Sequence, residues 1–170
     1  TIMHRIVETN ANIFVQYSTI SLNTSTSHGA GIYNYSYAKN VYQLHTGKGV
    51  TPQYTYATAT TDVRMENSTM SNNEILTSGS GAGLYNYAYS YIHNYSQGKT
   101  VSNIYIVNST ITSNIATENG AGIYNYTTSD QSVSTLYLIN SIVYGNYTGT
   151  VGYDIEFDGD TSERWLHTAY

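Results

Sequence analysis

The residues best suited to chemistry in this chain form one acidic segment. Residues 154–160 read Asp-Ile-Glu-Phe-Asp-Gly-Asp, so carboxylates alternate with other residues and a glycine follows, as at the start of an EF-hand calcium loop. The Glu that such a loop needs at its twelfth position is missing, because Trp165 stands there and Glu163 lies two residues short. Two interpretations remain open: a solvated acidic turn, or a calcium site made by Asp154, Glu156, Asp158 and Asp160.

No other pattern predicts catalysis. The chain has no Cys, which excludes disulfides, thiol catalysis and Cys-type zinc sites. It contains neither a Gly-x-Ser-x-Gly element nor a phosphate-binding Gly-Lys-Ser/Thr loop. Glycosidases need paired carboxylates, but Asp130 is the only acid between Glu118 and Asp154. We therefore expect that the protein is not an enzyme and has no cofactor beyond calcium. The histidines show no metal-ligand spacing: His4, His28, His45, His93 and His167.

Charge and hydropathy exclude some classes of binding partner. Only 10% of the residues are charged and the net charge is -5, with six basic residues that lie far apart. Because no basic stripe exists, we expect no nucleic-acid partner. The longest apolar runs have four residues, which predicts no membrane insertion. The chain begins at Thr1 without a signal peptide, so we expect a mature, processed or fragmentary chain.

An internal repeat determines the expected architecture. The string Gly-Ala-Gly-(Ile/Leu)-Tyr-Asn occurs at 29–34, 81–86 and 120–125. A second element precedes each copy, and it reads Asn-Ser-Thr-Met-Ser-Asn-Asn at 67–73 and Asn-Ser-Thr-Ile-Thr-Ser-Asn at 108–114. Self-similarity of this kind predicts stacked structural repeats.

The repeats align in register at every apolar position. If the aligned position zero is Tyr17, Asn67, Asn108 and Asn140, the positions four and two before it and three after it are aliphatic or Met in all four copies. The intervening residue three before zero is not consistently apolar, which indicates a strand with one buried face. Three short strands separated by bends predict one coil of a β-solenoid, and the coils stack so that equivalent residues align.

The sixth position after zero is Asn in all four copies: Asn23, Asn73, Asn114 and Asn146. We expect these side chains to point inward and to form a structural ladder in which each amide bonds the next. The alternative is that they merely occupy turns. The distance from the Asn of the glycine motif to the next zero position varies from 33 to 22 to 15 residues, so insertions leave the coil from one corner.

Tyrosine, with 20 copies, recurs with period two after each glycine motif. The alternate positions, such as Ile32, Asn34 and Ser36, are aliphatic, small or amide side chains and share a phase with the core, which places the tyrosines outward. An exposed aromatic face is typical of contact with a partner, either a protein surface or sugar rings. The alternative is that the insertions cover these rings. The expected contact surface comprises Tyr33, Tyr35, Tyr37, Tyr85, Tyr87, Tyr89, Tyr91, Tyr124 and Tyr126.

The sequence also contains seven Asn-x-Ser/Thr sequons, slightly more than composition predicts. Asn23 and Asn146 fall in the expected ladder and should not be glycosylated. Asn94, which lies in an insertion, is the best candidate for carrying a glycan. A glycoprotein would explain how so little charge keeps the chain soluble. The glycosylation candidates are Asn34, Asn67, Asn94, Asn108 and Asn125.

Asn-Ser-Thr-Ile-x-x-Asn followed by Gly-x-Gly-Ile-Tyr-Asn resembles the repeats of right-handed parallel β-helix proteins of the pectate-lyase-like superfamily. The resemblance covers about residues 11–158 and points to non-enzymatic surface proteins such as polymorphic outer-membrane adhesins. It implies an all-β, right-handed parallel β-helix, a secreted or cell-surface location and no catalytic site. This fold hosts many functions, so the resemblance is specific for architecture alone.

We therefore expect one β-solenoid domain over 1–170, with an N-terminal segment at 1–12, about four coils at 13–156 and a C-terminal tail at 157–170. The expected function is that of an extracellular structural protein, either a self-assembling fibre or filament subunit or an adhesin segment. The alternative is a glycan-binding module that uses the tyrosine face. Solenoid ends are normally capped, and neither end carries a large cap, so we expect either a segment of a longer β-helix or copies that associate head to tail.

Overall fold

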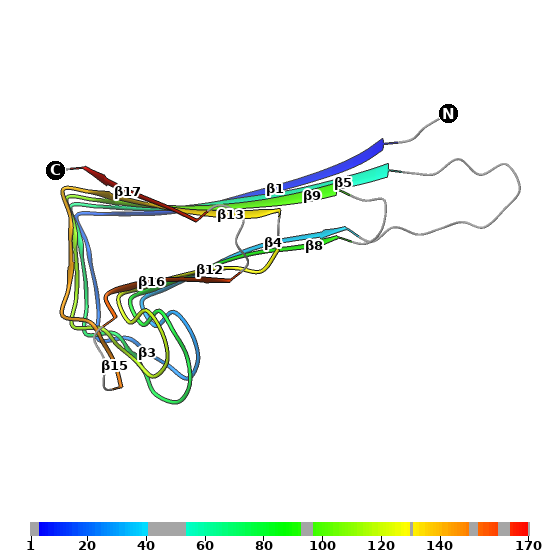
Figure 1. Cartoon of the computed structure of the whole chain (residues 1–170). Coiled ribbons are helices and arrows are strands. Elements are labelled where there is room, and N and C mark those ends of the chain that lie inside the picture. Colours follow the sequence, from blue (N-terminus) through cyan, green and yellow to red (C-terminus); the bar gives the residue numbers. More distant parts are fainter. Residues whose placement is uncertain are drawn as a thin grey trace, which may run out of the picture.

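The protein is all-β in a computed structural model that describes residues 4–40, 54–92, 97–129, 131–149, 153–159 and 164–169. No helix occurs in these ranges. The chain winds through four coils, and each coil contributes one strand to each of four parallel sheets (Figure 1). The predicted parallel β-solenoid of about four coils is therefore confirmed.

The four sheets are named here A to D in the order in which a coil meets them. Sheet A contains β1 (His4–Gln16), β5 (Tyr54–Glu66), β9 (Gln97–Val107), β13 (Ser132–Ile139) and β17 (Arg164–Ala169). Sheet B contains β2 (Thr19–Ser21), β6 (Thr69–Ser71), β10 (Thr110–Thr112) and β14 (Ile142–Tyr144). Sheet C contains β3 (Thr24–Ser25), β7 (Glu74–Ile75), β11 (Ile115–Ala116) and β15 (Tyr147–Thr148). Sheet D contains β4 (Ile32–Asn40), β8 (Leu84–Ile92), β12 (Ile123–Thr127) and β16 (Ile155–Gly159).

The repeat register of the sequence is the strand register of the structure. Ile13 pairs with Val63, Val63 with Ile104, and Ile104 with Leu136. Each turn from sheet A to sheet B is made by the residue at position zero, which has a positive φ between 46° and 49° in all four coils. Asn adopts this backbone conformation more readily than most residues, which explains its recurrence there.

One apolar core runs through the stack between the sheets. Its members come from the repeated positions of sheets A, B and D, and in the two middle coils they are fully buried. Successive coils place equivalent side chains above one another, so each core position is a continuous apolar column. The fully buried members are Val63, Met65, Met70, Leu84, Ile104, Ile106, Ile111, Ile123 and Leu136.

The segments of variable length leave the coil between sheets D and A, at the single corner that the sequence predicts. Their described parts are not loops but long extensions of β4, β5, β8 and β9, which form two facing layers (Figure 1). Ala38, Ala57 and Ala59 form a small buried cluster between these layers. Small side chains there allow the two sheets to lie close together.

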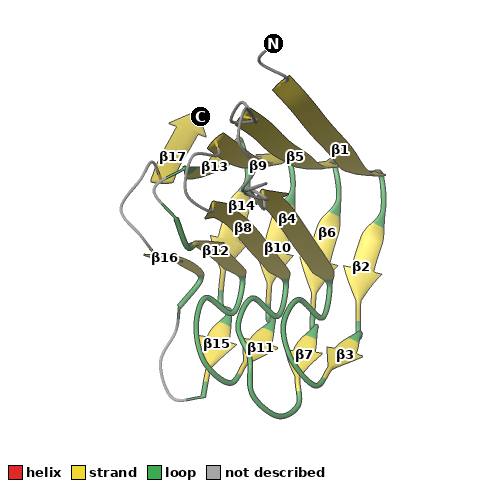
Figure 2. Ribbon diagram, turned by 90° about the vertical axis from the view of Figure 1, so that its right-hand side faces the viewer, coloured by secondary structure: helices red, strands yellow, loops and turns green. Residues whose placement is uncertain are grey.

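The strands extend past the coil limits that the repeat suggests. β1 begins at His4 and pairs with β5 along its whole length, so residues before Ile13 already belong to the first coil. β16 continues to Gly159, and β17 pairs in parallel with β13, from Arg164 opposite Ser134 onward. Figure 2 shows the coils side by side, with β2 at one end of sheet B and β14 at the other.

Candidate functional site

The outer face of sheet D carries tyrosines that lie in register on three successive coils. Tyr33, Tyr85 and Tyr124 form one column, because β4 pairs with β8 and β8 with β12 at these residues. A second column contains Tyr35, Tyr87 and Tyr126, and a third contains Tyr37 and Tyr89. Together with Tyr91, these are the nine residues that the sequence places outward, and they are called the tyrosine face below. Their role as a contact surface remains a prediction.

Rings within each column stack on one another. The ring centroids of Tyr33 and Tyr85 are 5.2 Å apart with planes at 4°, and those of Tyr87 and Tyr126 are 5.0 Å apart at 25°. Stacked rings cover each other's faces. The tyrosine face therefore presents ring edges and hydroxyl groups outward, and among the described residues a ring face without a stacked column neighbour occurs at the ends of the columns.

Burial changes along the columns. Tyr33 is 48% exposed and Tyr37 is 39% exposed, whereas Tyr85 and Tyr124 are only 5% exposed. Tyr85 lies between the rings of Tyr33 and Tyr124 and also stacks on His28 at 4.4 Å. Burial raises the pKa of the Tyr85 hydroxyl well above its usual value. In the first column, the accessible ring is therefore that of Tyr33, in the first coil.

Acidic residues end the columns at the fourth coil. Glu156 pairs with Tyr124 and Asp158 with Tyr126 in the register of β12 and β16. The Tyr124 hydroxyl donates to Asp158 Oδ2 at 2.8 Å, and the backbone N–H of Gly120 donates to Glu156 Oε2 at 3.0 Å. Burial, and then the hydrogen bond to Asp158, raise the pKa of the Tyr124 hydroxyl. Both carboxylates thus serve contacts within the chain.

The calcium site remains a prediction, and the contacts of three of its four residues are as follows. Asp154 lies just before β16 and accepts from Asn146, while Glu156 and Asp158 lie on the tyrosine face and have other partners. Each of these three carboxylates therefore has a hydrogen-bond partner within the chain. No group of three or more acidic or histidine side chains in the described ranges could hold a metal ion, and Asp160 lies outside those ranges.

The asparagine ladder expected from the repeat is present. The amide Nδ2 of Asn23 donates to Asn73 Oδ1 at 2.9 Å, that of Asn73 to Asn114 at 2.8 Å and that of Asn114 to Asn146 at 2.8 Å. Each Oδ1 of the later rungs also accepts the backbone N–H of the preceding rung. Asn73, Asn114 and Asn146 are buried and Asn23, at the first coil, is exposed. This ladder is a structural element and leaves no amide free for a ligand in the middle coils.

A second ladder, which the sequence reasoning did not recognise, lies inside sheet D. Asn34 Nδ2 donates to Asn86 Oδ1 at 2.6 Å, and Asn86 Nδ2 donates to Asn125 Oδ1 at 2.7 Å. Hydroxyls from sheet A join it, since Ser102 bonds both Asn34 and Asn86. The signal was available, because this Asn occurs in every copy of the glycine motif and shares the inward phase of Ile32.

This second ladder overturns two glycosylation candidates. Asn34 and Asn125 are buried inside the solenoid, where Asn34 Nδ2 donates to the ladder and Asn125 Oδ1 accepts from it, so no transferase could reach them. Asn67 and Asn108 are exposed at the corner between sheets A and B, which leaves their sequons accessible. Asn94 lies outside the described residues.

Among the described side chains, the one histidine is His28, and its contacts are structural. His28 Nδ1 accepts the backbone N–H of Ser80 at 3.0 Å while its ring stacks on Tyr85. The side chains of His4 and His167, like residues His45 and His93, fall outside the described part of the chain.

Comparison with protein-family models, with curated proteins and with solved structures gives no match. Within the described ranges, no helix is long and apolar enough to cross a membrane. The assignment of a function therefore depends on the geometry of the tyrosine face and of the ladders behind it.

Proposed function

We propose that this chain is a non-catalytic structural segment of an extracellular or cell-surface protein of the adhesin type, and that it contacts its partner through the tyrosine face. The observation that carries the proposal is the set of in-register tyrosine columns, whose rings are most exposed at the first coil. Tyr combines a large apolar ring with a polar tip and loses little conformational entropy on binding, which suits it to protein interfaces.

The backing of this face supports a rigid contact surface. The inner side of the same strands is held by the ladder of Asn34, Asn86 and Asn125 and by the apolar core. Stacking also holds each ring against its neighbours in the column. A surface that is ordered before binding loses less conformational entropy when it associates with a partner. The carboxylates at its edge bond Tyr124 and Gly120, which supports contact rather than catalysis.

A glycan-binding module is the alternative, and the ring geometry favours it less. Sugar recognition by aromatic residues uses the open face of a ring, yet stacking covers both faces of Tyr85 and Tyr87. A sugar would have to use a ring that no column encloses, such as the outer face of Tyr33. The hydroxyl tips could still donate hydrogen bonds to a glycan, so the experiment below includes polysaccharides.

A fibre subunit that stacks head to tail is the other form of the expected function. The fourth coil offers less support for it, because its asparagine ladder ends on an acceptor, Asp154, and sheet A continues there into β17. Glycosylation at Asn67 and Asn108 would be compatible with either extracellular form, since both residues lie away from sheet D.

The test compares two triple variants of the full chain. One replaces Tyr33, Tyr35 and Tyr37 by Ser, and the control makes the same change at Tyr144, Tyr147 and Tyr153, which are also exposed but lie outside the tyrosine face. Binding to immobilised fibronectin and collagen, and to a panel of immobilised polysaccharides, is measured by biolayer interferometry. We expect protein binding that falls at least about tenfold in the first variant alone.

Two results would contradict this proposal. Equal losses in both triple variants would show non-specific adhesion of tyrosine, and binding to polysaccharides alone would establish the glycan-binding alternative. Circular dichroism of both variants checks that the fold is retained.

A further inference from the structure

The rings of the tyrosine face are close neighbours both along the strands and across the coils. The ring centroids of Tyr87 and Tyr126 lie 5.0 Å apart across two coils, and those of Tyr126 and Tyr124 lie 5.9 Å apart along β12. Tyr85 closes a second path, since its ring centroid lies 6.3 Å from that of Tyr87 and 5.5 Å from that of Tyr124. Each step is short enough for an electron to pass directly from ring to ring.

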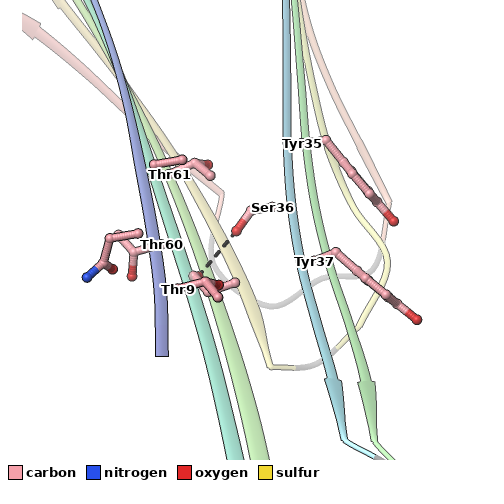
Figure 3. Close-up of a pocket in the computed structure, with 9 residues that line it drawn as sticks. Thr9, Tyr35, Ser36, Tyr37, Thr60 and Thr61 are labelled. Carbon is pink, nitrogen blue, oxygen red and sulfur yellow. Dashed lines mark hydrogen bonds between the residues drawn. The ribbon is translucent and has the colours of Figure 1, made fainter. Parts of the chain in front are cut away.

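Alternation along the strands of sheet D keeps these rings outside the core. Figure 3 shows Tyr35 and Tyr37 on the outer side of β4, directed away from the cavity between sheets A and D, with Ser36 pointing inward between them. Ser36 Oγ donates to the Ala59 carbonyl at 3.2 Å, which holds the strand in this phase. Tyr35 pairs with Tyr87, so the next coil has the same phase. The rings therefore form one layer on the outer side of the sheet.

The rings of the second and third coils differ in their access to solvent. Tyr87 and Tyr126 are half-buried, whereas Tyr124 is only 5% exposed. Both β8 and β12 have a neighbouring strand on each side, so this difference does not depend on where the chain begins or ends. A reagent in solution can therefore meet the edges of Tyr87 and Tyr126, while it reaches Tyr124 through the other rings.

The hydroxyl groups of the exposed and the buried ring have different partners. The Tyr124 hydroxyl donates to Asp158 Oδ2 at 2.8 Å, and a carboxylate can accept a proton. The Tyr87 hydroxyl lies 3.3 Å from Thr128 Oγ1, a hydroxyl group that is not a base near neutral pH. A phenol that loses an electron becomes a strong acid, so its oxidation is easier where a base already holds the phenolic hydrogen. Of these two rings, Tyr124 is therefore the more stable site for an oxidising equivalent.

We propose that the tyrosine face is a one-electron oxidation site: an outer-sphere oxidant removes an electron at the edge of Tyr87 or Tyr126, and the oxidising equivalent settles on Tyr124 as its proton passes to Asp158. The electron lowers the charge of the oxidant by one unit. The phenolic O–H bond breaks and an O–H bond forms at Asp158 Oδ2, which leaves a neutral tyrosyl radical beside a neutral carboxylic acid. This chemistry does not depend on the contact function proposed for the same face.

The probe is tris(bipyridine)ruthenium(III), an outer-sphere oxidant that becomes ruthenium(II) when it accepts one electron. The full chain is mixed with less than one equivalent of this complex, frozen and examined by electron paramagnetic resonance. We expect a long-lived tyrosyl signal in the wild type and its loss in Tyr124→Phe. The matched control is Tyr105→Phe, which should leave the signal unchanged, because Tyr105 stacks on Tyr137 at 4.6 Å on sheet A, outside the tyrosine face.

Asp158→Asn tests the proton acceptor, because an amide keeps the shape of the side chain but is not a base for a phenol. This variant should also lose the long-lived signal. The oxidising equivalent then stays at the exposed ring edges, where radicals of two molecules couple through a carbon–carbon bond, so dityrosine fluorescence should rise. Glu74→Gln removes an exposed carboxylate on sheet C and should behave as the wild type. Circular dichroism checks that each variant is folded.

Several outcomes would overturn the proposal. One is the absence of a tyrosyl signal in the wild type, or its replacement by a tryptophanyl signal from Trp165, which has a different hyperfine pattern. Another is a signal that survives in Tyr124→Phe or disappears equally in Tyr105→Phe. A signal that persists in Asp158→Asn, without a rise in dityrosine, would refute Asp158 as the proton acceptor and with it the proposed settling site.

Discussion

The Asp154 carboxylate accepts two hydrogen bonds from Asn146, one from its backbone N–H and one from its side-chain amide, both at 2.8 Å. In the earlier coils these two bonds are accepted by the Asn of the next coil. Because an ionised carboxylate only accepts, Asp154 satisfies the last rung and offers no donor to a further one. The ladder therefore has a defined end within the chain.

Removal of this end should destabilise the fourth coil. Asp154→Ala leaves the buried Asn146 without two acceptors, so we expect a loss of about 2 to 3 kcal/mol in the free energy of unfolding. Asp154→Asn retains an acceptor oxygen and should cost less than about 1 kcal/mol. Urea unfolding of the three proteins gives the comparison. Equal losses in both variants would show that charge, rather than acceptor geometry, matters at this position.

An interior rung should matter more than the exposed first rung. Asn114 accepts from Asn73 and donates to Asn146 and to the Met70 carbonyl, all within the buried core. Asn114→Ala should lower the free energy of unfolding by roughly 3 kcal/mol, because several buried polar groups lose their partners. Asn23→Ala should cost about 1 kcal/mol, since Asn23 is solvent-exposed and donates only to Asn73. Similar costs at the two positions, measured by urea unfolding, would contradict a cooperative ladder.

The glycine that precedes β4, β8 and β12 makes room for the ladder. A Cβ at Gly83 would overlap the carbonyl oxygen of Gly122 and lie 3.2 Å from Asn114 Nδ2. We expect Gly83→Ala to cost about 3 kcal/mol, at the upper end for overpacking. Gly149→Ala is the control, because its Cβ meets no atom within 4 Å and only its positive φ is unfavourable, which costs about 1 kcal/mol. Thermal unfolding ranks the two variants, and the opposite rank would refute this packing argument.

Stability should decrease at alkaline pH. Burial holds the pKa of Tyr85 and Tyr124 above the value of 10.0 that applies to an unfolded chain. Below pH 10 both states keep these protons and the contribution is fully present, whereas above it the unfolded chain releases protons that the folded chain retains. The free energy of unfolding should therefore fall as pH rises past 10. Tyr85→Phe should make the fall shallower, and an unchanged slope in this variant would disprove the assignment to Tyr85.

Much of the architecture follows from periodicity. The aliphatic positions around Asn67 and Asn108 predict the buried face of sheet A, and their spacing relative to Asn73 and Asn114 predicts the ladder. These features repeat in every coil, so a single sequence contains several independent copies of the same evidence. The long variable segments lack such copies, and the sequence reasoning took them as insertions, although their described parts extend sheets A and D.

The sequence by itself determined the strand register, the apolar core and the phase that puts Asn inward and Tyr outward, because alternation along a strand is a local property. Only the tertiary structure decided what lies above and below each residue. It buried Tyr85 while leaving Tyr33 exposed, it placed Asn34 beyond the reach of glycosylation, and it made Asp154 the last acceptor of a hydrogen-bond ladder. These outcomes depend on which coil a residue belongs to, and therefore on contacts between segments far apart in the chain.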